Sequence, residues 1–410
     1  MASGLTRGQL TVLASACAVA VSAVYGGQPV LEVAGADLGF TDGALGWLVA
    51  AGQLGYLIGL VLLVPLGDLH DRRRLITTHL LLIAVGTATA AVAPSGAVAI
   101  AGLAVAGLFA TVVQTTVAYV AAVSPVGERG RNIGIVTSGV VIGILGVRVI
   151  AGLLGELTDW RMIYLVIAGS CVVLAFAARR GLDPDVRATR ARYGRAVSEM
   201  GRLFVTDPLL RSRGVIAFFL FASFGTLWSG LAPVLAAAPW HFGTTVIGLF
   251  GLAGLTGALG AARAGRWSDK GRAPSITTWS LALLAGSWLL IGHAESSLWP
   301  LIVGIVVLDF AVQAVHVSSQ HLLTVAHPGR SSGVIGVYMA CYSLGSALGA
   351  VTTTLVYTAA GWPATGLLGG AYAVLGLLVA VLTRRSTRPD AHADRADIRP
   401  QPVADIGCRT

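Results

Sequence analysis

The chain contains few charged residues and few cysteines for its length. Charged side chains make up 11% of its 410 residues and hydrophobic ones 55%, whereas soluble domains carry about 25% charged residues. This composition excludes an ordinary soluble protein. The spacing of the cysteines fits neither a disulfide framework nor a metal site, and we interpret those in apolar runs as small buried side chains. The four cysteines are Cys17, Cys171, Cys341 and Cys408.

Sequence signatures of common catalytic sites are also absent. The chain has no Gly-x-x-x-x-Gly-Lys-Ser/Thr loop that would cradle the phosphates of ATP. It has no Gly-x-Ser-x-Gly nucleophile turn and no His-Glu-x-x-His zinc helix. We therefore predict that the protein is not an enzyme, has no metal site, needs no cofactor and is not driven directly by ATP.

Long apolar runs are what the chain does contain. A helix needs about 20 apolar residues to cross about 30 Å of hydrocarbon at 1.5 Å per residue. The 53 glycines suit helices that pack closely in lipid, because small residues let backbones approach one another. We predict an all-α membrane protein with twelve transmembrane helices, at residues 9–31, 43–66, 75–93, 97–122, 133–156, 162–178, 214–238, 244–264, 275–293, 299–325, 333–358 and 364–383.

Two short motifs indicate an internal duplication. Gly67–Arg74 and Gly265–Arg272 both begin Gly-x-(large apolar)-x-Asp-(Arg/Lys), and their first glycines are 198 residues apart. A glycine and a tryptophan separated by 26 residues also occur twice, as Gly134 with Trp160 and as Gly336 with Trp362. A repeat of about 200 residues between apolar runs is typical of transporters built from two related membrane bundles.

We accordingly divide the chain into two bundles of six helices related by a pseudo-twofold axis. The N-terminal bundle is 1–180 and the C-terminal bundle is 213–383. The polar, Arg-rich segment 181–212 is predicted to be a cytoplasmic linker with a short amphipathic helix around 192–205. Residues 384–410 are rich in Asp, Arg, Pro and Ala, which bury too little apolar surface to fold, so we expect a disordered cytoplasmic tail.

Cationic residues are confined to one set of predicted loops. If the twelve spans alternate, 26 of the 28 Lys and Arg residues lie on one side of the membrane, while the opposite loops hold Arg161 together with several acids. This is the positive-inside pattern, so we expect both termini in the cytoplasm. The arginines are spread over separate loops without a nucleic-acid motif. We therefore predict the lipid bilayer, and no nucleic acid, as their partner.

The loop motifs and one glycine-rich run resemble a known family. Gly67–Arg72 resembles the most recognisable motif of the major facilitator superfamily, and its weaker twin Gly265–Lys270 occupies the equivalent loop; both are one residue shorter than the common form. The run Gly139, Gly143, Gly146, Arg148 and Gly152 resembles the glycine-rich motif of the drug/proton antiporter branch, although Ile144 replaces a usual proline. Segments that resemble a subgroup of bacterial efflux permeases are Gln28-Pro29, Pro65–Leu69 and Leu308–Phe310.

This resemblance implies two bundles that alternate access to a central cavity, in the cytoplasmic membrane of a bacterium. It also implies a conformational latch at the cytoplasmic surface, formed by Gly67, Asp68, Asp71, Arg72, Arg131, Asp269 and Lys270. Within this latch we expect Asp71 to lie against the N-terminus of the eleventh span, near Ser331 and Ser332, where the helix dipole favours an anion. The alternative is that the arginines of the loop only fix topology.

Asp309 is the most informative polar residue inside a predicted span. It lies about 15 Å deep in the tenth span, where an ionisable group costs about 2.5–3.5 kcal/mol on insertion scales. Gln313, His316 and Gln320 follow at helical spacing and share its face. A carboxylate in a partly dry cavity suits proton uptake and release near neutral pH, and His316 is a second candidate. Alternatively, the stripe only packs against polar groups of neighbouring helices.

Arg148 is the other charge inside a predicted span, and a buried cation needs a partner. Glu32, Glu156 and Asp309 are the candidate acids. Depth favours Glu32, because both residues belong to the outer part of the membrane in the predicted topology. Glu32 is therefore our third candidate for proton coupling. Arg148 is interpreted either as a group that binds an anionic part of the substrate or as half of a structural ion pair.

Polar and aromatic side chains in several spans are candidates for substrate binding. Gln114 lies 202 residues before His316, at the matching place in the repeat, and Trp228 is a candidate aromatic wall. Each of these groups has the alternative role of holding helices together. The candidate set is Tyr25, Gln28, Gln53, Tyr56, Gln114, Arg148, Trp228, Gln313 and Gln320.

These features together predict a secondary active transporter, monomeric, that exports a small organic molecule such as a drug or metabolite in exchange for protons. The sequence leaves two alternatives open. One is an uptake symporter or facilitator for a sugar or organic acid, and the other is a membrane receptor or assembly partner that transports nothing.

Overall fold

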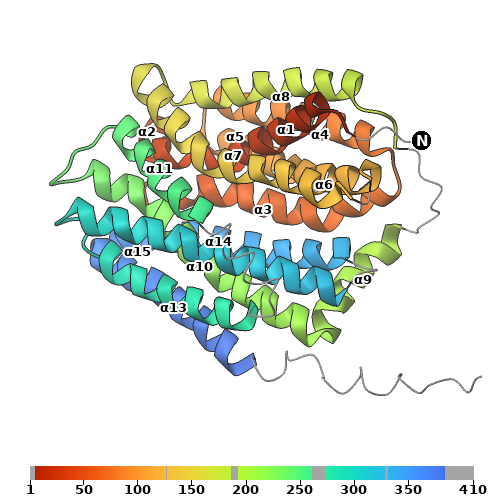
Figure 1. The fold of residues 1–410 in the computed structure, drawn as a ribbon. Helices are drawn as coiled ribbons and strands as arrows, with labels where there is room; N and C mark the ends of the chain where they lie inside the picture. Colours follow the sequence, from red (N-terminus) through yellow and green to blue (C-terminus); the bar gives the residue numbers. More distant parts are fainter. Residues whose placement is uncertain (1–4, 126, 186–192, 261–272, 328–330, 384–410) are drawn as a thin grey trace, which may run out of the picture.

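A computed structural model describes residues 5–125, 127–185, 193–260, 273–327 and 331–383 (Figure 1). Within these ranges the secondary structure is entirely helical. The first half of the chain contains α1 (Arg7–Tyr25), η1 (Gln28–Val30), α2 (Leu31–Asp37), η2 (Asp42–Ala44), α3 (Gly46–Leu62), η3 (Val64–Asp68), α4 (Arg72–Ala91), α5 (Gly96–Phe109), α6 (Val112–Val123), α7 (Arg129–Leu157) and α8 (Arg161–Gly181), where η denotes a 3-10 helix. The second half contains α9 (Tyr193–Thr206), α10 (Pro208–Ala236), α11 (Thr244–Gly260), α13 (Ala273–Ile291), α14 (Leu298–Ala326) and α15 (Ser331–Thr383).

The described helices have the length and composition of an integral membrane protein. Eight helical segments are long and apolar enough to cross a membrane, and three shorter ones, in α3, α11 and α13, are also apolar. Each predicted span overlaps one of these helices, with α15 covering the last two. Gly361 interrupts α15 with a φ of 71°, a conformation that glycine adopts without strain. The number of crossings, twelve, stays a prediction.

Two predicted spans differ from the helices that form. The first was expected to run to residue 31, but α1 ends at Tyr25. The pair Gly26-Gly27 follows, and Pro29, which lacks a backbone N–H, favours the tighter turn η1 before the short helix α2. The span at 97–122 is divided into α5 and α6.

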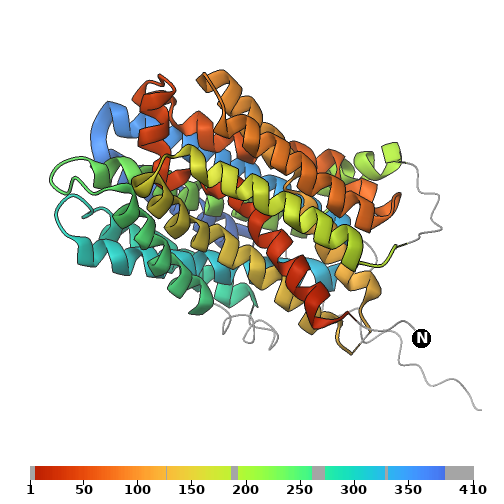
Figure 2. The same ribbon diagram turned by 90° about the horizontal axis from the view of Figure 1, so that it is seen from above.

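The same packing pattern occurs in each half of the chain. α1 packs against α7 as α10 packs against α15, α4 against α8 as α13 against α15, and α3 against α5 as α11 against α14. In Figure 1 the first half, coloured red to yellow, lies above most of the second half, coloured green to blue, and the view from above in Figure 2 shows the long helices side by side. This recurrence agrees with the repeat in the sequence.

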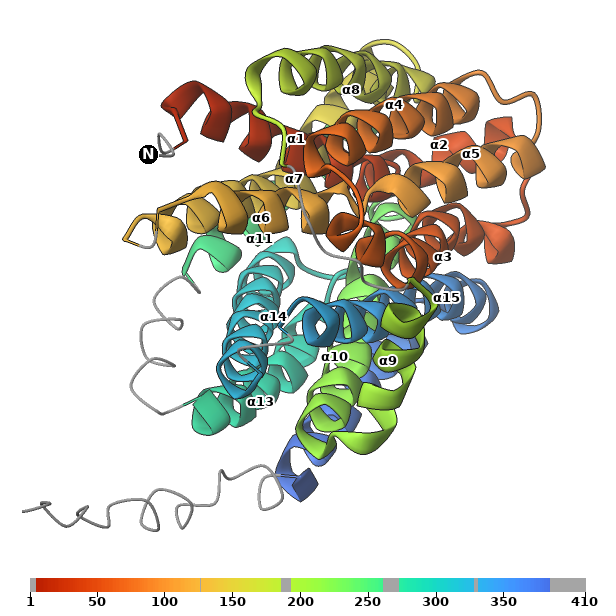
Figure 3. The ribbon, with the colours of Figure 1, turned by 90° about the vertical axis from the view of Figure 1, so that its right-hand side faces the viewer.

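The two halves meet along two seams, visible end-on in Figure 3. The first seam lies between α3 and α15, and the second lies between α7 and α11. Glycine permits both contacts: a Cβ on Gly46 would lie 2.5 Å from the Ala350 carbonyl oxygen, and a Cβ on Gly152 would lie 2.3 Å from the Thr244 carbonyl oxygen. The seams therefore bring backbones into direct contact.

The linker contains the predicted amphipathic helix. α9 spans Tyr193–Thr206, against the expected 192–205, and packs on η3, α3, α10 and α15. The Tyr193 hydroxyl donates to the Leu62 carbonyl at 2.8 Å, so α9 is attached to both halves beside the first seam. The predicted tail 384–410 and the second loop motif, 265–272, lie outside the described residues.

Candidate substrate cavity

A cavity of about 800 Å³ lies between the two halves, within the range typical of small-molecule sites. Its inner end is lined by Tyr25, Gln53 and Asp309, and Arg72 and Gly333 line it nearer the linker. The exposed lining residues Thr137, Ser138 and Thr324 mark its mouth. The mouth is therefore at the end of the molecule that carries the linker, which the sequence predicts to be cytoplasmic. The remaining candidates that line it are Tyr56, Gly67, Gln114, Gln313, His316 and Gln320.

The polar face of α14 turns toward this cavity. Asp309, Gln313, His316 and Gln320 all contribute to its lining, as their helical spacing predicts. Asp309 is 1% exposed, and its Oδ2 has no hydrogen-bond partner among the described residues. It is also the only carboxylate among the described residues that line the cavity. One oxygen of this buried carboxyl group is therefore outside any hydrogen bond, while the charge of the group interacts with that of Arg148.

His316 is held by its neighbours on α14 and α15. The Gln320 amide nitrogen lies 3.1 Å from His316 Nε2 and donates to it. The other ring nitrogen, Nδ1, then carries the proton and donates to the Tyr338 hydroxyl at 3.0 Å. The imidazole also packs edge-on against Phe221, with ring centroids 5.3 Å apart. Both ring nitrogens of His316 are thus hydrogen-bonded, whereas Oδ2 of Asp309 is not.

Polar contacts join the two halves at the inner end of the cavity. The hydroxyls of Tyr25 and Tyr342 are hydrogen-bonded to each other. Ser343 Oγ donates to the Gln53 carbonyl oxygen at 2.5 Å. Within the first half, the Gln114 amide donates to the Tyr56 hydroxyl at 2.7 Å. Tyr25 and Gln53 therefore serve the closure between the halves as well as the cavity wall.

The aromatic wall consists of residues that sequence reasoning missed. Phe221, Phe224 and Tyr342 line the cavity, and the Phe221 and Tyr342 ring centroids are 3.9 Å apart. Trp228, our candidate for this wall, does not line the cavity: it lies one turn beyond Phe224, buried at 2% exposure. Tyr338 was also missed; it lies four residues before Tyr342 and therefore on the same helix face, but this spacing alone does not mark a cavity wall.

Arg148 has a different partner from the one that depth favoured. Its Nε and Nη2 donate to Gln28 Oε1 at 3.1 and 2.7 Å, and its guanidinium carbon lies 3.8 Å from the centroid of the Trp228 ring. Glu32 is not among its contacts, because α1 ends at Tyr25 and carries Glu32 away on α2. Gln28 thus replaces Glu32 as the partner, and Glu32 is not brought into the cavity with Asp309 and His316.

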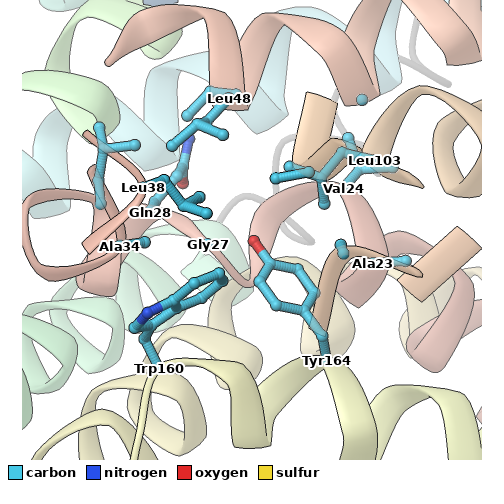
Figure 4. A pocket seen from close by; sticks show the side chains of 15 residues that line it. Ala23, Val24, Gly27, Gln28, Ala34, Leu38, Leu48, Leu103, Trp160 and Tyr164 are labelled. Atoms are coloured by element: carbon cyan, nitrogen blue, oxygen red, sulfur yellow. The ribbon is translucent and has the colours of Figure 1, made fainter. Parts of the chain in front are cut away.

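Beyond Gln28 lies a second cavity of about 20 Å³ (Figure 4), large enough for one water molecule. Trp160 and Tyr164 line it, and the Tyr164 hydroxyl points toward Gly27. The Trp160 indole donates to Asp37 at 3.2 Å, and Arg161 Nη1 donates to the same carboxylate at 2.5 Å. At the end of the molecule opposite the linker, the two halves are joined by hydrogen bonds from the Thr354 hydroxyl to the Gly43 carbonyl at 3.2 Å and from Thr245 N to Glu156 Oε2 at 3.0 Å.

The glycine-rich run of α7 serves two different helix contacts. A Cβ on Gly139 or Gly143 would lie 2.2 or 2.3 Å from a carbonyl oxygen of α1. Gly152 instead faces α11 across the second seam, whereas a Cβ on Gly146 would meet only Ile142 of its own helix, at 3.8 Å. Three of the four glycines are thus required by packing.

The first loop motif is attached to the linker. Asp71 caps α4 by accepting from Arg73 N at 3.0 Å, and it accepts from Asp185 N at 3.1 Å. Arg72 Nη1 is ion-paired with Asp185 Oδ2 at 3.2 Å and donates to the Ala118 carbonyl at 3.1 Å. In this conformation Asp71 therefore binds the linker, whereas we expected it at Ser331 and Ser332, whose side chains lie outside the described part of the chain.

The other predicted latch residues show no contact that bears on the latch within the described part of the chain. Arg131 is exposed on the first turn of α7 and has no ion pair among the described residues. The side chain of Asp68, and both Asp269 and Lys270, lie outside the described residues.

The fold and the sequence can be matched to known proteins. The sequence matches the model of the Major Facilitator Superfamily over residues 11–325 and 214–407. This chain belongs to that family. It is a transport protein of the major facilitator type and not an enzyme. It is 37% identical to an uncharacterized transporter, YgaY, of Escherichia coli O157:H7, over 92% of this chain and 95% of that protein.

More distant relatives of this major facilitator protein include one that bears a functional name. It is 28% identical to a chloramphenicol resistance protein of Streptomyces lividans, over 84% of this chain and 86% of that protein. The structure of this chain is similar to that of a bacterial homologue of the human lysosomal transporter Spinster in an inward-facing and occupied conformation. The TM-score is 0.74 at 15% identity, over 92% of this chain and 96% of that one, and at this identity the likeness shows the fold alone.

Proposed function

We propose that this protein exports a small organic molecule in exchange for protons, by alternating access, in the cytoplasmic membrane of a bacterium with both termini inside. The observation that carries the proposal is Asp309: a buried carboxyl group that lines the cavity between the halves, with its Oδ2 outside any hydrogen bond. Such a group is suited to bind a proton on one side of the membrane and release it on the other.

Arg148 provides a way for this proton to bias the two halves. Arg148 belongs to the first half and Asp309 to the second, and their charges interact. Ionised Asp309 attracts the guanidinium, whereas neutral Asp309 leaves it on Trp228 and Gln28. A proton or a cationic substrate on Asp309 therefore favours one arrangement of the halves over the other, which is what a coupled transporter requires.

The available driving force suffices for this cycle. A pH difference of one unit supplies about 1.4 kcal/mol per proton, and a membrane potential of 100 mV supplies about 2.3 kcal/mol per charge. For a neutral substrate, one proton per cycle thus sustains a gradient of several hundredfold. Exchange for a singly charged cation is electroneutral, so only the pH difference acts and sustains about tenfold. Similarity to a chloramphenicol resistance protein supports the direction of transport.

The test begins with a ligand-stabilisation screen of the purified protein. Hits are then added to proteoliposomes that contain a pH-sensitive dye. We expect hits to move protons, and we expect Asp309→Asn to reduce gradient-driven transport at least tenfold while binding persists. Asp159→Asn, in an exposed loop, is the matched control and should resemble the parent.

Each alternative predicts a different result. Cells that produce the parent should retain less of a hit compound than cells that produce Asp309→Asn; more retention by the parent would indicate an uptake symporter. Transport that ignores the pH gradient would rule out proton coupling. No substrate-dependent movement of any kind would favour the receptor.

A further inference from the structure

A neutral side chain, and not a carboxylate, holds the buried cation Arg148. Arg148 is 1% exposed, and its Nε and Nη2 both donate to Gln28 Oε1, at 3.1 and 2.7 Å. Its Nη1 donates to the Ile144 carbonyl oxygen of the same helix at 2.5 Å. Gln28 is itself 3% exposed and does not line the large cavity. Because buried charges are usually paired with an opposite charge, the uncharged partner needs a reason.

The break after α1 places this amide at the junction of the two halves. A Cβ on Gly27 would lie 2.3 Å from the Tyr164 hydroxyl oxygen, so a larger residue there would have to displace Tyr164. The chain then enters η1 with Pro29 in its first turn. η1 packs against α7 of the first half and against α10 and α11 of the second. Gln28 therefore lies where a rearrangement of the halves would change its surroundings.

Asp309 is a second acceptor close to the same guanidinium. The charges of Arg148 and Asp309 interact, but the guanidinium donates to Gln28, and Asp309 Oδ2 is outside any hydrogen bond. Both groups lie beside the Trp228 indole. The guanidinium carbon is 3.8 Å from its ring centroid, and a Cβ on Gly254 would lie 2.8 Å from its Cζ2 and 2.9 Å from Asp309 Oδ2.

The other groups that face the guanidinium do not compete for it as anions. Tyr25 of α1 and Tyr342 of α15 interact with its charge, and phenols are neutral near pH 7. α10 presents aromatic rings, and α11 presents Gly251, where an added Cβ would lie 3.1 Å from Arg148 Cβ. Among the described residues whose charge acts on Arg148, Asp309 is the only carboxylate.

We propose that Gln28 is a positioning residue that competes with Asp309 for the guanidinium of Arg148. A hydrogen bond from a charged donor to an amide is weaker than one to a carboxylate. The amide therefore holds the guanidinium while Asp309 is protonated and yields it when Asp309 is ionised. The inference rests on the proposed function, because it identifies the group that sets the balance of the proton switch at that same site.

Infrared spectroscopy tests this competition at the carboxyl group itself. A protonated carboxyl group has a C=O stretching band that an ionised carboxylate lacks. Subtracting the spectrum of the corresponding Asp309→Asn variant isolates the band of Asp309, and its loss as the pH rises gives the pH of half-ionisation. The probe is the proton, so the titration of the purified protein needs no substrate.

Two substitutions of Gln28 should move this pH in opposite directions. Gln28→Met removes the acceptor, so the guanidinium moves to Asp309 and stabilises its ionised form; the pH of half-ionisation should fall by about one unit. Gln28→Glu supplies a stronger acceptor whose negative charge offsets the guanidinium, and should raise it by about one unit. A side chain that only filled space would change the unfolding temperature without opposed shifts.

Gln9, on the first turn of α1, offers the matched control. Its amide donates to the Gly181 carbonyl at 2.8 Å, and Gln9→Met and Gln9→Glu should leave the half-ionisation of Asp309 at the parental pH. Thermal unfolding checks that each variant folds; if Gln28→Met does not, Gln28→Glu still decides the question. An unchanged pH in Gln28→Glu, or shifts of the same sign in both Gln28 variants, would overturn the competition.

Failure of the proposed function would look different. If the opposed shifts occur but hits of the ligand screen move no protons in proteoliposomes, the proposed function is wrong while the positioning role of Gln28 stands. If the hits move protons and the shifts are absent, proton coupling stands and Gln28 does not set its balance.

Discussion

The guanidinium of Arg148 rests on the face of the Trp228 indole, with 3.8 Å between the guanidinium carbon and the ring centroid. The two residues belong to different halves of the transporter, so this contact is part of the closure between them. A desolvated cation–π contact of this kind contributes about 2 kcal/mol. Its loss should weaken the conformation in which the cavity opens at the linker end.

Trp228→Ala should lower stability and transport together, because the buried guanidinium of Arg148 then loses the aromatic face that lies nearest to it. We expect a loss of about 3–5 kcal/mol in the free energy of unfolding and at least tenfold slower transport. Trp228→Phe keeps an aromatic face and should lose less than half as much. Thermal unfolding and proteoliposome transport measure both effects. Trp279→Ala, at a side chain 73% exposed, is the control. Equal losses for Trp228→Phe and Trp228→Ala would show that the aromatic face does not stabilise Arg148.

Two glycines of the glycine-rich run, Gly152 and Gly146, should respond differently to one added methyl group. In Gly152→Ala the new Cβ would lie 2.3 Å from the Thr244 carbonyl oxygen, which forces α7 and α11 apart. We expect at least tenfold slower transport. Gly146→Ala meets only its own helix at 3.8 Å and should stay within twofold of the parent. Transport rates in proteoliposomes decide the matter, and a similar loss in both variants would contradict the proposed role of the second seam.

The pair Arg72–Asp185 should hold the linker to the first half. Its side chains are 4% and 13% exposed, with Nη1 and Oδ2 3.2 Å apart. A double-mutant cycle with Arg72→Gln and Asp185→Asn, followed by thermal unfolding, should give a coupling energy of about 1–3 kcal/mol. The exposed pair Arg161–Asp37, with side chains 30% and 46% exposed, serves as the comparison and should give less than about 1 kcal/mol. Equal coupling in the two pairs would show that burial adds nothing here.

The predicted topology places Thr41 and Tyr193, both exposed, on opposite sides of the membrane. Cysteines introduced there, with Cys341 and Cys408 replaced by serine, can be labelled with a membrane-impermeant maleimide; Cys17 and Cys171 are buried. We expect Thr41→Cys to react in intact cells and Tyr193→Cys only after the cells are permeabilised. Reaction of both in intact cells would refute the arrangement of twelve alternating spans.

Polar residues within an otherwise apolar helix could be located from the sequence. Asp309, Gln313, His316 and Gln320 share a face because the helical period fixes their relative direction, and that face lines the cavity. Phe221, Phe224 and Tyr342 line the same cavity but could not be singled out. Aromatic residues are common in apolar spans, so nothing in the pattern separates a cavity wall from lipid-facing or packed positions.

The partner of Arg148 illustrates a second limit. Depth along a helix suggested Glu32, but depth does not specify the direction in which a side chain points. The chain also leaves its first helix at Tyr25, which removes Glu32 from the span and brings Gln28 to the guanidinium. The glycine pair and Pro29 that cause this break are visible in the sequence, although their consequence for Glu32 depends on how α2 folds back.

The glycines of α11 have a consequence for how fast the halves can move. A Cβ on Gly248 would lie 2.5 Å from the Arg148 carbonyl oxygen, and one on Gly251 would lie 2.8 Å from that of Leu145. Gly248 and Gly251 present no side chain to α7, so the two backbones lie directly against each other there, with the stem of the Arg148 side chain beside Gly251. The polar links that must break include those from Thr244 and Thr245 to Gly152 and Glu156. On a surface with so few side chains and hydrogen bonds, we expect the separation of α7 from α11 to contribute little to the energy barrier between the two arrangements of the halves.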